Sequence, residues 1–563
     1  MVITILFILI FGLLKDFQLM RKITLSVAFV LLVAVAVKAQ NNTNILDKTG
    51  IELKLFNAHQ DYLKGDYAVA LNEYKQANTA KPNDASILFH MGQCYLVMND
   101  MDNAVINLEK AESIDPNGGN ELHLNLGQAY LQSDILDKSL KELQMYKQKY
   151  ADDPKQLKES DVDYYIGQCN SAIKLEGHPV KVTITNMGTS VNSEYDDKTP
   201  LLAKDGKMII FTSSRPSMSS GKTKEGEAPV VFDNIYSTEF DSTTNKWGLS
   251  YMMQGDINEP YSQNAATGIS ADGQYLFMFK NNGQDATGGD IFVAKRAHTG
   301  TYGSPVTLGH PVNTSYYEDG ATLSPDGGTL YFMSEKPGGF GQADIYKSDK
   351  IGKTEWSEPV NLGSAINTPY DDGSPCVAPD GKTIFFSSQG HNSMGGYDIF
   401  KATMSDSGKW GTAVNLGYPI NSVSNDKSFT ISIDAKTGYF ASDRKSGMGA
   451  RDIYMVDLSQ YPLLASDSAS NKPKGLSILR GMVANQKGKG IEGAHITVID
   501  SSGAKTSLQT SSEGRYYITL KGNATYKVKA DAKGYKSTTQ TIRLPQSALG
   551  TYSMEQNFEL EKD

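Results

Sequence analysis

Cysteine, tryptophan and histidine are scarce in this sequence, whose 563 residues include 3 Cys, 3 Trp and 8 His. So few cysteines exclude the disulfide framework of many exported proteins, and we expect Cys94, Cys169 and Cys376 to be buried structural thiols. The histidines are scattered singly, and neither an H-E-x-x-H nor a G-x-S-x-G motif occurs. The sequence therefore predicts no catalytic residues, no cofactor and a protein that is not an enzyme.

An excess of basic residues is also missing. The formal net charge is −9 and no Lys/Arg cluster stands out, which argues against a nucleic-acid partner. Hydrophobic residues at 39% and charged residues at 21% are typical of a folded protein. A chain of 563 residues is too long for one hydrophobic core, so several domains are expected.

The N-terminus begins with an apolar run, residues 1–14, that is shorter than the roughly 20 residues of a membrane-spanning helix. From Met20 the letters "MRK" start an export signal, in which a basic pair precedes an apolar stretch and residues 37–39 offer a cleavage site. We expect translation to start at Met20 and the mature protein to start at Gln40. An uncleaved anchor is the alternative.

A period of 34 residues marks the region that follows. The motifs "MGQCYL", "LGQAYL" and "IGQCNS", with an alanine one repeat earlier, put small residues at one equivalent position: Ala58, Gly92, Gly127 and Gly167. This is the tetratricopeptide period, in which each helix-turn-helix unit buries its apolar face against its neighbours. Residues 40–176 resemble a short tetratricopeptide array of about three repeats, with a capping helix around Gly167.

The stacked first helices of such repeats line a concave groove. Apolar and amide side chains occupy the groove-facing positions and are candidate partner-binding residues: Phe89, Gln93, Leu96, Leu124, Gln128 and Leu131. The alternative is that these side chains only pack between helices.

The phrase "SPDGGTLYFMSE", at residues 324–335, recurs in related form four more times. The aspartates of its last four copies, Asp272, Asp326, Asp380 and Asp434, are 54 residues apart, and Asp205 precedes the first of them by 67. Asp-Gly pairs between β-branched and aromatic runs predict hairpins. Asp434 is followed by alanine, and we expect Gly438 to supply that turn. Two more strands follow each hairpin, so five units of four strands predict a five-bladed β-propeller over residues 177–460.

The fifth unit has no fourth strand of its own. The segment "VKVTITNMGTSVNSEYDD", before the first hairpin, matches "PVNLGSAINTPYDD", before the fourth. We therefore predict that residues 180–188 complete the last blade and close the ring, which removes exposed sheet edges. These units resemble the WD40-like PD40 propeller repeats of bacterial envelope proteins.

An acidic or amide residue precedes the innermost strand of each unit. The strings "YDDK", "YSQN", "YYEDG", "YDDG" and "SNDK" place one such residue at an equivalent position: Asp197, Asn264, Asp319, Asp372 and Asp426. In a closed propeller these positions surround one mouth of the central channel, where oxygen ligands suit Ca²⁺. The alternative is a set of turns in which each side chain bonds its own backbone.

The C-terminal block follows a Ser/Asn/Pro/Lys-rich linker over residues 461–476. Its strands alternate apolar and polar residues between Gly-containing turns, which predicts a small antiparallel sandwich. Residues 477–563 resemble the carboxypeptidase regulatory-like domain, a transthyretin-like β-sandwich. The sequence as a whole thus predicts a multidomain α plus β protein, with a signal region over residues 1–39.

Signal, tetratricopeptide repeats, PD40 propeller and regulatory-like sandwich, in this order, resemble a family of bacterial envelope proteins that includes an accessory component of the type IX secretion and gliding apparatus. Many relatives add an OmpA-like domain that binds peptidoglycan, and that property is not carried over here. The resemblance implies an interaction scaffold of the periplasm or outer membrane, associated with the membrane indirectly through envelope proteins of a secretion or motility complex. The alternative is a glycan-binding or glycan-processing propeller.

One long loop departs from the repeat pattern. Residues 215–231 replace the short Gly-rich turn found in the third unit, and long loops on rigid scaffolds often carry function. Its charged residues are candidate partner-binding groups: Lys222, Lys224, Glu225 and Glu227. The alternative is ordinary surface variation.

Overall fold

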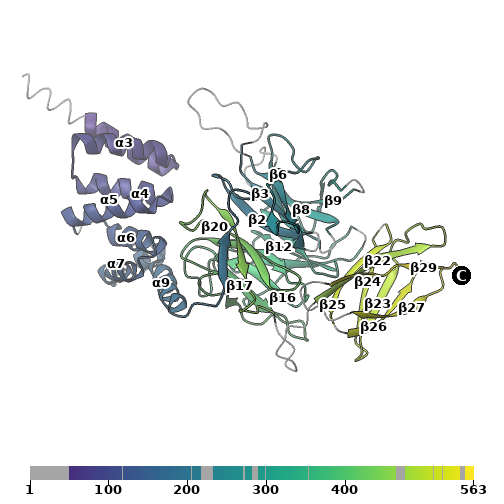
Figure 1. The fold of residues 1–563 in the computed structure, drawn as a ribbon. Helices are drawn as coiled ribbons and strands as arrows, with labels where there is room; N and C mark the ends of the chain where they lie inside the picture. Colours follow the sequence, from purple (N-terminus) through teal and green to yellow (C-terminus); the bar gives the residue numbers. More distant parts are fainter. Residues whose placement is uncertain are drawn as a thin grey trace, which may run out of the picture. The chain divides into compact units, whose positions relative to one another are not determined.

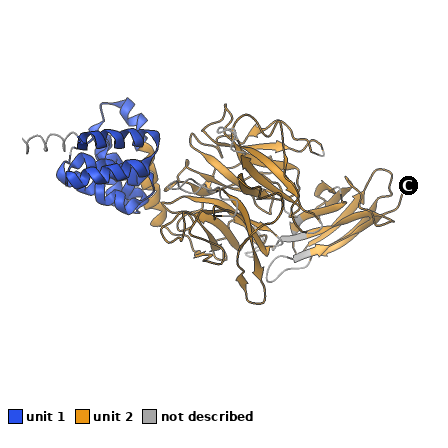
Figure 2. Cartoon of the chain, turned by 90° about the horizontal axis from the view of Figure 1, so that it is seen from above, with its two compact units in different colours: residues 1–162 blue, residues 163–563 orange. Residues whose placement is uncertain are grey.

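The structure is a computed structural model in two compact units, residues 1–162 and 163–563, shown in different colours in Figure 2. It describes residues 50–116, 118–203, 206–216, 232–270, 273–281, 289–297, 300–352, 354–464, 476–511, 513–522, 524–544 and 552–563. The expected signal region, residues 1–39, lies outside these ranges. Each unit is considered by itself below.

The first unit is helical. Residues 50–64 form its first described helix. The helices that follow are α3 (Tyr67–Ala80), α4 (Ala85–Val97), α5 (Met101–Ile114), α6 (Leu122–Gln132), α7 (Leu136–Lys149) and α8 (Pro154–Glu159), seen in purple to blue in Figure 1. Asp84 and Asp100 begin α4 and α5 by accepting backbone N–H bonds at the helix N-termini. The successive helix pairs reproduce the 34-residue period, so the helical tetratricopeptide-like region is confirmed.

Two of the repeated glycines allow close contact within a helix pair. A Cβ atom at Gly92 would lie 2.5 Å from Leu108 Cγ, and one at Gly127 would lie 2.5 Å from Leu143 Cγ. In the third repeat, Ser139 replaces a small apolar residue, and its buried hydroxyl donates to the Gly127 carbonyl oxygen at 2.7 Å. The small residues that recur every 34 residues therefore lie where α4 contacts α5 and where α6 contacts α7.

Replacement of Gly127 by alanine is expected to destabilise the helical unit by about 1–3 kcal/mol, because the added methyl group overpacks a buried contact. The control is Gly167→Ala, in a helix of the second unit, where a Cβ atom meets nothing within 4 Å. That change should be neutral or stabilising by up to about 1 kcal/mol, since alanine favours the helix. Urea unfolding followed by circular dichroism measures both. Equal effects at the two positions would contradict the close approach.

The second unit begins with α9 (Val162–Glu176), of which residues 163–176 belong to this unit. The Tyr164 ring stacks on Tyr370 with centroids 4.3 Å apart, and its hydroxyl donates to the Gln389 carbonyl oxygen at 3.0 Å. Gln168 donates to the carbonyl oxygen of Gly395. These contacts attach α9 to the loops of one β-sheet, whereas the sequence predicted this helix only as a cap on the repeats.

Five small antiparallel sheets follow (Figure 1). Sheet I contains β2 (Asp197–Ala203), β3 (Met208–Ser213), β4 (Asn234–Asp241), β5 (Lys246–Trp247) and β6 (Tyr251–Met252); sheet II contains β7 (Gln263–Ile269), β8 (Tyr275–Asn281), β9 (Asp290–Lys295) and β10 (Val306–Thr307). Sheet III contains β11 (Glu318–Leu323), β12 (Thr329–Ser334), β13 (Asp344–Asp349) and β14 (Val360–Asn361); sheet IV contains β15 (Asp372–Val377), β16 (Thr383–Ser388), β17 (Asp398–Thr403) and β18 (Val414–Asn415). Sheet V contains β19 (Asp426–Ile431), β20 (Thr437–Ser442), β21 (Asp452–Asp457) and the N-terminal strand β1 (Thr183–Asn186).

Each sheet is joined to the next by a backbone hydrogen bond. An amide at the start of a first strand donates to the carbonyl oxygen just before the third strand of the preceding sheet. The five bonds run from Asp197 to Arg451 (2.9 Å), Asn264 to Asp233 (3.0 Å), Glu318 to Gly289 (3.0 Å), Asp372 to Ala343 (2.9 Å) and Asp426 to Tyr397 (2.7 Å). The first of them joins sheet I to sheet V. Because the first strands also neighbour one another in this order, the five sheets form a closed cycle.

The predicted N-terminal strand is confirmed. β1 pairs antiparallel with β21, with Thr183 opposite Asp457 and Asn186 opposite Tyr454. The Asn186 amide also donates to the Asp452 carboxylate at 2.7 Å. Sheet V therefore takes its fourth strand from the N-terminal side of sheet I, as the matched sequences predict.

An asparagine, buried in four of the five sheets, clamps the third strand of every sheet. Its side-chain oxygen accepts from the N–H of one isoleucine, and its amide donates to the carbonyl oxygen of the same residue, at 2.7–3.0 Å. The pairs are Asn192–Ile453, Asn258–Ile235, Asn313–Ile291, Asn367–Ile345 and Asn421–Ile399. The asparagine oxygen gives the isoleucine N–H a partner, and the asparagine amide adds a second donor to a carbonyl that already accepts a backbone N–H.

The hairpin turn of sheet V differs from the prediction. Gly327 and Gly381 adopt φ values of 72° and 66° in the turns of sheets III and IV. In sheet V the equivalent Ala435 itself adopts a φ of 55°. Gly438 lies inside β20, where a Cβ atom would come within 2.6 Å of the Phe429 ring, so it serves packing and not the turn.

The C-terminal region is a β-sandwich. Its strands are β22 (Leu476–Asn485), β23 (His495–Ile499), β24 (Lys505–Gln509), β25 (Arg515–Lys521), β26 (Ala524–Asp531), β27 (Thr538–Leu544), β28 (Tyr552–Glu555) and β29 (Phe558–Leu560). One sheet has the order β24-β23-β26-β27, and the other has β22 between β25 and β28, with β29 also on β22. The expectation of a purely antiparallel sandwich is wrong here, because β28 and β29 pair parallel to β22.

Two further expectations concern the membrane and the cysteines. Within the described part of the chain, none of the helices combines the length and apolar character needed to cross a bilayer. Cys94 and Cys169 are buried and Cys376 is half-buried. Burial raises the pKa of the Cys94 and Cys376 thiols to about 11, which keeps both protonated at neutral pH.

Candidate functional site

The first strands of the five sheets carry the predicted acidic ring, with one correction. Asp372 and Asp426 begin β15 and β19, each opposite a serine of the second strand. In sheet III the residue opposite Ser334 is Glu318, and Glu318 also makes the backbone bond to the preceding sheet. Asp319 lies one position later. The string "YYEDG" contains two adjacent acidic residues, Glu318 and Asp319. When its Asp-Gly pair is aligned with that of "YDDG", Asp319 takes the ring position that Glu318 occupies in the structure.

The carboxylates of this ring bond their own turns. Each accepts from the backbone N–H and the hydroxyl of a residue four positions earlier, as Asp197 does from Ser193 at 2.7 Å in both bonds. The other pairs are Glu318 with Thr314, Asp372 with Thr368 and Asp426 with Ser422. Asn264 likewise bonds the backbone of Glu259 and Ser262. These bonds are the ones expected if each side chain only stabilises its own turn. Binding of Ca²⁺ at the ring stays a prediction.

Asp372 differs from its counterparts in its neighbours. Arg215 donates to Asp197 at 2.9 Å and Arg444 donates to Asp426 at 2.5 Å, whereas Gly390 stands at the equivalent position of sheet IV. Oδ1 of Asp372 is buried without a hydrogen-bond partner in the described part of the chain. Burial, with a smaller contribution from the Asp344 charge, raises the pKa of Asp372 to about 7.

This pKa predicts a specific pH dependence. The native state keeps the Asp372 proton up to about pH 7, whereas the unfolded chain loses it near pH 4, so the stability from this group falls as pH rises between these values. The free energy of unfolding of Asp372→Asn, relative to that of the wild type, should therefore increase by on the order of 2 kcal/mol between pH 5 and pH 8.

Urea unfolding of both proteins at the two pH values measures the gain. The control is Asp426→Asn, which leaves Arg444 without its carboxylate and should lose stability at pH 8. A difference between Asp372→Asn and wild type that does not change with pH would contradict the raised pKa.

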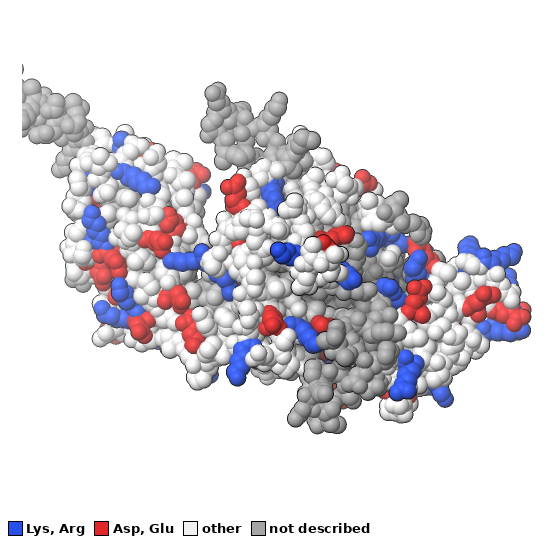
Figure 3. All heavy atoms as spheres, in the orientation of Figure 1, with Lys and Arg blue, Asp and Glu red and all other residues white. Residues whose placement is uncertain are grey.

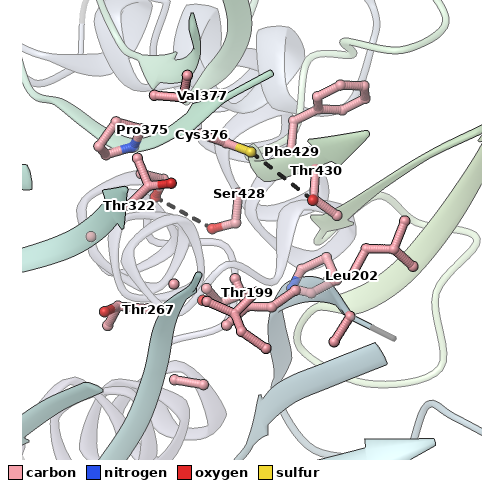
Figure 4. Close-up of a pocket in the computed structure, with 18 of the residues that line it drawn as sticks. Thr199, Leu202, Thr267, Thr322, Pro375, Cys376, Val377, Ser428, Phe429 and Thr430 are labelled. Carbon is pink, nitrogen blue, oxygen red and sulfur yellow. Dashed lines mark hydrogen bonds between the residues drawn. The ribbon is translucent and has the colours of Figure 1, made fainter. Parts of the chain in front are cut away.

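A cavity of about 390 Å³ lies among the first strands of the five sheets. Its wall is rich in hydroxyl groups and has apolar side chains between them; those labelled in Figure 4 are Thr199, Leu202, Thr267, Thr322, Pro375, Cys376, Val377, Ser428, Phe429 and Thr430. Thr267 Oγ1 is buried and has no hydrogen-bond partner among the described residues. The cavity can therefore accept a small molecule by hydrogen bonds and apolar contact.

One part of the cavity wall is charged. Lys198 Nζ lies 2.9 Å from Asp233 Oδ2 and 3.3 Å from Asp196 Oδ2. Arg451 donates to both oxygens of Asp196 at 2.7 and 2.5 Å, and these contacts hold the pKa of that carboxyl below its usual value against the effect of burial. The network joins sheet V to sheet I, because Arg451 and Asp196 come from the two sheets that close the cycle.

Lys427 is the second lysine of the cavity wall. Its ammonium lies 3.5 Å from the centroid of the Tyr397 ring, and burial together with the charge of Arg451 lowers its pKa to about 8. Tyr397 in turn donates to Asp371 at 3.1 Å. Cationic and anionic groups thus alternate in this part of the wall and pair with one another. Lys198 and Lys427 end the strings "YDDK" and "SNDK", from which the sequence predicted only the acidic residues as site residues.

The predicted groove residues fall into two groups. Gln93, Leu124 and Leu131 are buried, with exposed fractions of 8%, 7% and 3%, as expected for side chains that pack between helices. Phe89, Leu96 and Gln128 are half-buried and reach the surface of α4 and α6. These three are the groove positions that offer area to a partner.

The charged loop falls largely outside the described residues. Lys222, Lys224, Glu225 and Glu227 lie in residues 217–231, which the structure does not describe. Arg215 belongs to the sheet, since it bonds Asp197 and the Ser250 hydroxyl. On the described surface in Figure 3, acidic and basic side chains are interspersed within each unit.

Comparison with known protein families matches two segments. Residues 478–557 match the carboxypeptidase regulatory-like domain, and residues 85–117 match a tetratricopeptide repeat. The predictions of these two domains are confirmed. Tetratricopeptide repeats imply protein–protein interaction. No curated protein matches the chain.

Solved structures are similar to separate parts of the chain. The type III secretion translocator chaperone SycD of Yersinia enterocolitica is 21% identical, over 23% of this chain and 94% of its own, with a TM-score of 0.20. The TPR2B domain of yeast Sti1, in complex with pHsp70, is 17% identical over 21% and 95%, also with a TM-score of 0.20. 3-Chlorocatechol 1,2-dioxygenase of Rhodococcus opacus 1CP is 13% identical over 17% and 62%, with a TM-score of 0.15. This chain thus spans about three fifths of that dioxygenase.

Proposed function

We propose that the protein is a non-catalytic interaction scaffold of the bacterial periplasm or outer membrane. The observation that carries this proposal is the tetratricopeptide region, because its stacked helices leave Phe89, Leu96 and Gln128 accessible on neighbouring first helices. In this proposal the carboxypeptidase regulatory-like sandwich is a second, non-catalytic domain.

The five sheets are proposed to be the blades of a five-bladed β-propeller of the PD40 type. The support is the cyclic set of backbone bonds, the fourth strand of sheet V donated by the N-terminal segment, and one asparagine clamp in every sheet. A rigid ring of this kind presents loops to partners without a conformational change. Association with a type IX secretion or gliding complex belongs to the same proposal and rests on the order of the domains.

Export is part of the proposal. Cleavage after Ala39 should leave Gln40 as the first residue of the native protein, and N-terminal sequencing measures this directly. Recovery of residues 1–19 from the native protein would overturn the start at Met20 and the cleavage after Ala39, and would favour the uncleaved anchor.

Cross-linking and co-purification in bacterial cells test the scaffold itself. Two variants are informative: replacement of residues 217–231 by a short glycine-containing turn, which spares the Arg215 contacts, and Gln128→Arg in the groove. The control is Gln144→Arg, which makes the same change on the exposed face of α7. Both test variants should fold normally, and at least one should lose a co-purifying protein that the control keeps.

An identical set of partners in all three variants would overturn the scaffold. The glycan-binding alternative predicts a different result, in which the purified protein binds glycans and loses that binding when the cavity is altered by Thr322→Leu. A glycan array with wild type and this variant separates the two functions.

A further inference from the structure

Three potential metal ligands meet between the second and third tetratricopeptide repeats. Glu112 lies near the end of α5, His123 is the second residue of α6 and Glu142 lies in the middle of α7. One ligand atom from each lies within 4.8 Å of the other two. The three helices therefore place one imidazole and two carboxylates around a common point.

The bonding within this cluster is incomplete. His123 Nδ1 and Glu142 Oε2 are 2.7 Å apart, and the two residues are only 9% and 4% exposed. Glu112 is half-buried, and no hydrogen bond or ion pair is formed by its carboxylate with any described residue.

Two lysines lie near this cluster. Lys141 Nζ is 3.8 Å from Glu142 Oε1, but its side chain is 71% exposed and extends into solvent. Lys138 pairs with Glu109 at 2.9 Å, and Tyr130 donates to the same carboxylate at 2.6 Å. The cluster thus has two carboxylates for one imidazole and one solvated ammonium group.

We propose that Glu112, His123 and Glu142 form a zinc-binding site that links α5, α6 and α7. An imidazole nitrogen with two carboxylate oxygens is a donor set that Zn²⁺ accepts at about 2.0–2.2 Å, with a fourth position left for water. The imidazole favours zinc over the hard cations Mg²⁺ and Ca²⁺, which prefer oxygen alone. Tetrahedral ligands at these lengths are about 3.3–3.5 Å apart, so the His123–Glu142 contact needs to open by less than about 1 Å.

This site goes beyond the proposed scaffold function. It fixes the second repeat to the third through side chains in addition to apolar packing, and it requires no partner protein. Zinc would therefore raise the thermal stability of the helical unit and leave the partner set of the scaffold unchanged.

Zinc titration of the purified full chain tests the site, with the protein treated with chelator and freed of any affinity tag. Isothermal titration calorimetry measures the affinity, and Co²⁺ substitution reports tetrahedral coordination through its visible absorption. The variants are Glu112→Gln, which removes a ligand that has no other partner, and His123→Gln. The control is Glu159→Gln, which makes the same charge change on the exposed surface of α8.

We expect one zinc equivalent in the wild type and in Glu159→Gln, an affinity at least about tenfold weaker in Glu112→Gln, and loss of the Co²⁺ bands in His123→Gln. Absence of zinc binding by the wild type at micromolar metal overturns the proposal. So does wild-type affinity in Glu112→Gln, which means that zinc sits elsewhere on the surface. If His123→Gln does not fold, the comparison of Glu112→Gln with Glu159→Gln decides alone.

Discussion

A chain that begins at Glu194 is expected to lose the cooperative unfolding transition of the five-sheet cycle, whereas one that begins at Asp163 keeps it. The shorter chain lacks β1 and Asn192, so β21 becomes an unpaired edge and the backbone of Ile453 loses its clamp. Five sheets that close on themselves share one core, and opening one of them exposes the apolar faces of its neighbours.

Calorimetry and size-exclusion chromatography of the two truncated chains measure this effect. The chain from Asp163 corresponds to the second compact unit and is the matched control. We expect the chain from Glu194 to aggregate or to melt without a single sharp transition. A melting profile equal to that of the control would show that β1 does not close the cycle.

Replacement of Asn421 by alanine is expected to destabilise the second unit by about 1–3 kcal/mol, because the buried N–H of Ile399 loses the amide oxygen that accepts from it, while the Ile399 carbonyl keeps only the Leu416 N–H at 3.1 Å. Asn421 is completely buried, so water cannot replace its amide. The same change at Asn313 should have a similar effect, since the clamp recurs in sheet II with Ile291.

Asn392→Ala is the control for the clamp. Asn392 is exposed, and the bond it receives from Asn415 ends on its backbone oxygen, which alanine retains. Chemical unfolding measures the loss in free energy of unfolding for each of the three variants. The losses for Asn421→Ala and Asn313→Ala should be several-fold larger than the loss for Asn392→Ala. Equal losses at all three positions would contradict the clamp.

The asparagine clamp also shows how much of the structure could be predicted from the sequence. Its asparagines stand in "DINEP", "PVNTS", "AINTP", "PINSV" and "SVNSE", so the repeat of 54 residues contained the signal. A turn residue that recurs in every repeat and a clamp to another strand produce the same letters, however. Only the pairing of β1 with β21 shows that Asn192 serves a strand near residue 453, across the whole unit.

Periodic features were the predictable ones. Helix pairs, hairpins and the strand shared by sheet V all follow from spacing, because each repeat must bury its apolar face against the next. The acidic ring was predicted with one residue misplaced, since Glu318 and Asp319 are chemically alike and only the hydrogen-bond register separates them. The metal-ligand cluster was not predicted, because Glu112, His123 and Glu142 share no motif and meet only through helix packing.

The shared strand also predicts an order of events when the chain folds. The Asn186 amide meets the Asp452 carboxylate across 266 residues, so β1 stays without its partner strand until nearly all of the second unit has been made. Closing a loop of this length costs more entropy than any hairpin within one sheet. Sheets I to IV can form early from local hairpins, and completion of sheet V comes last. During that interval the edge of β21 and residues 180–188 are the segments most open to proteases and chaperones, which makes them the natural target for a pulse of limited proteolysis during refolding.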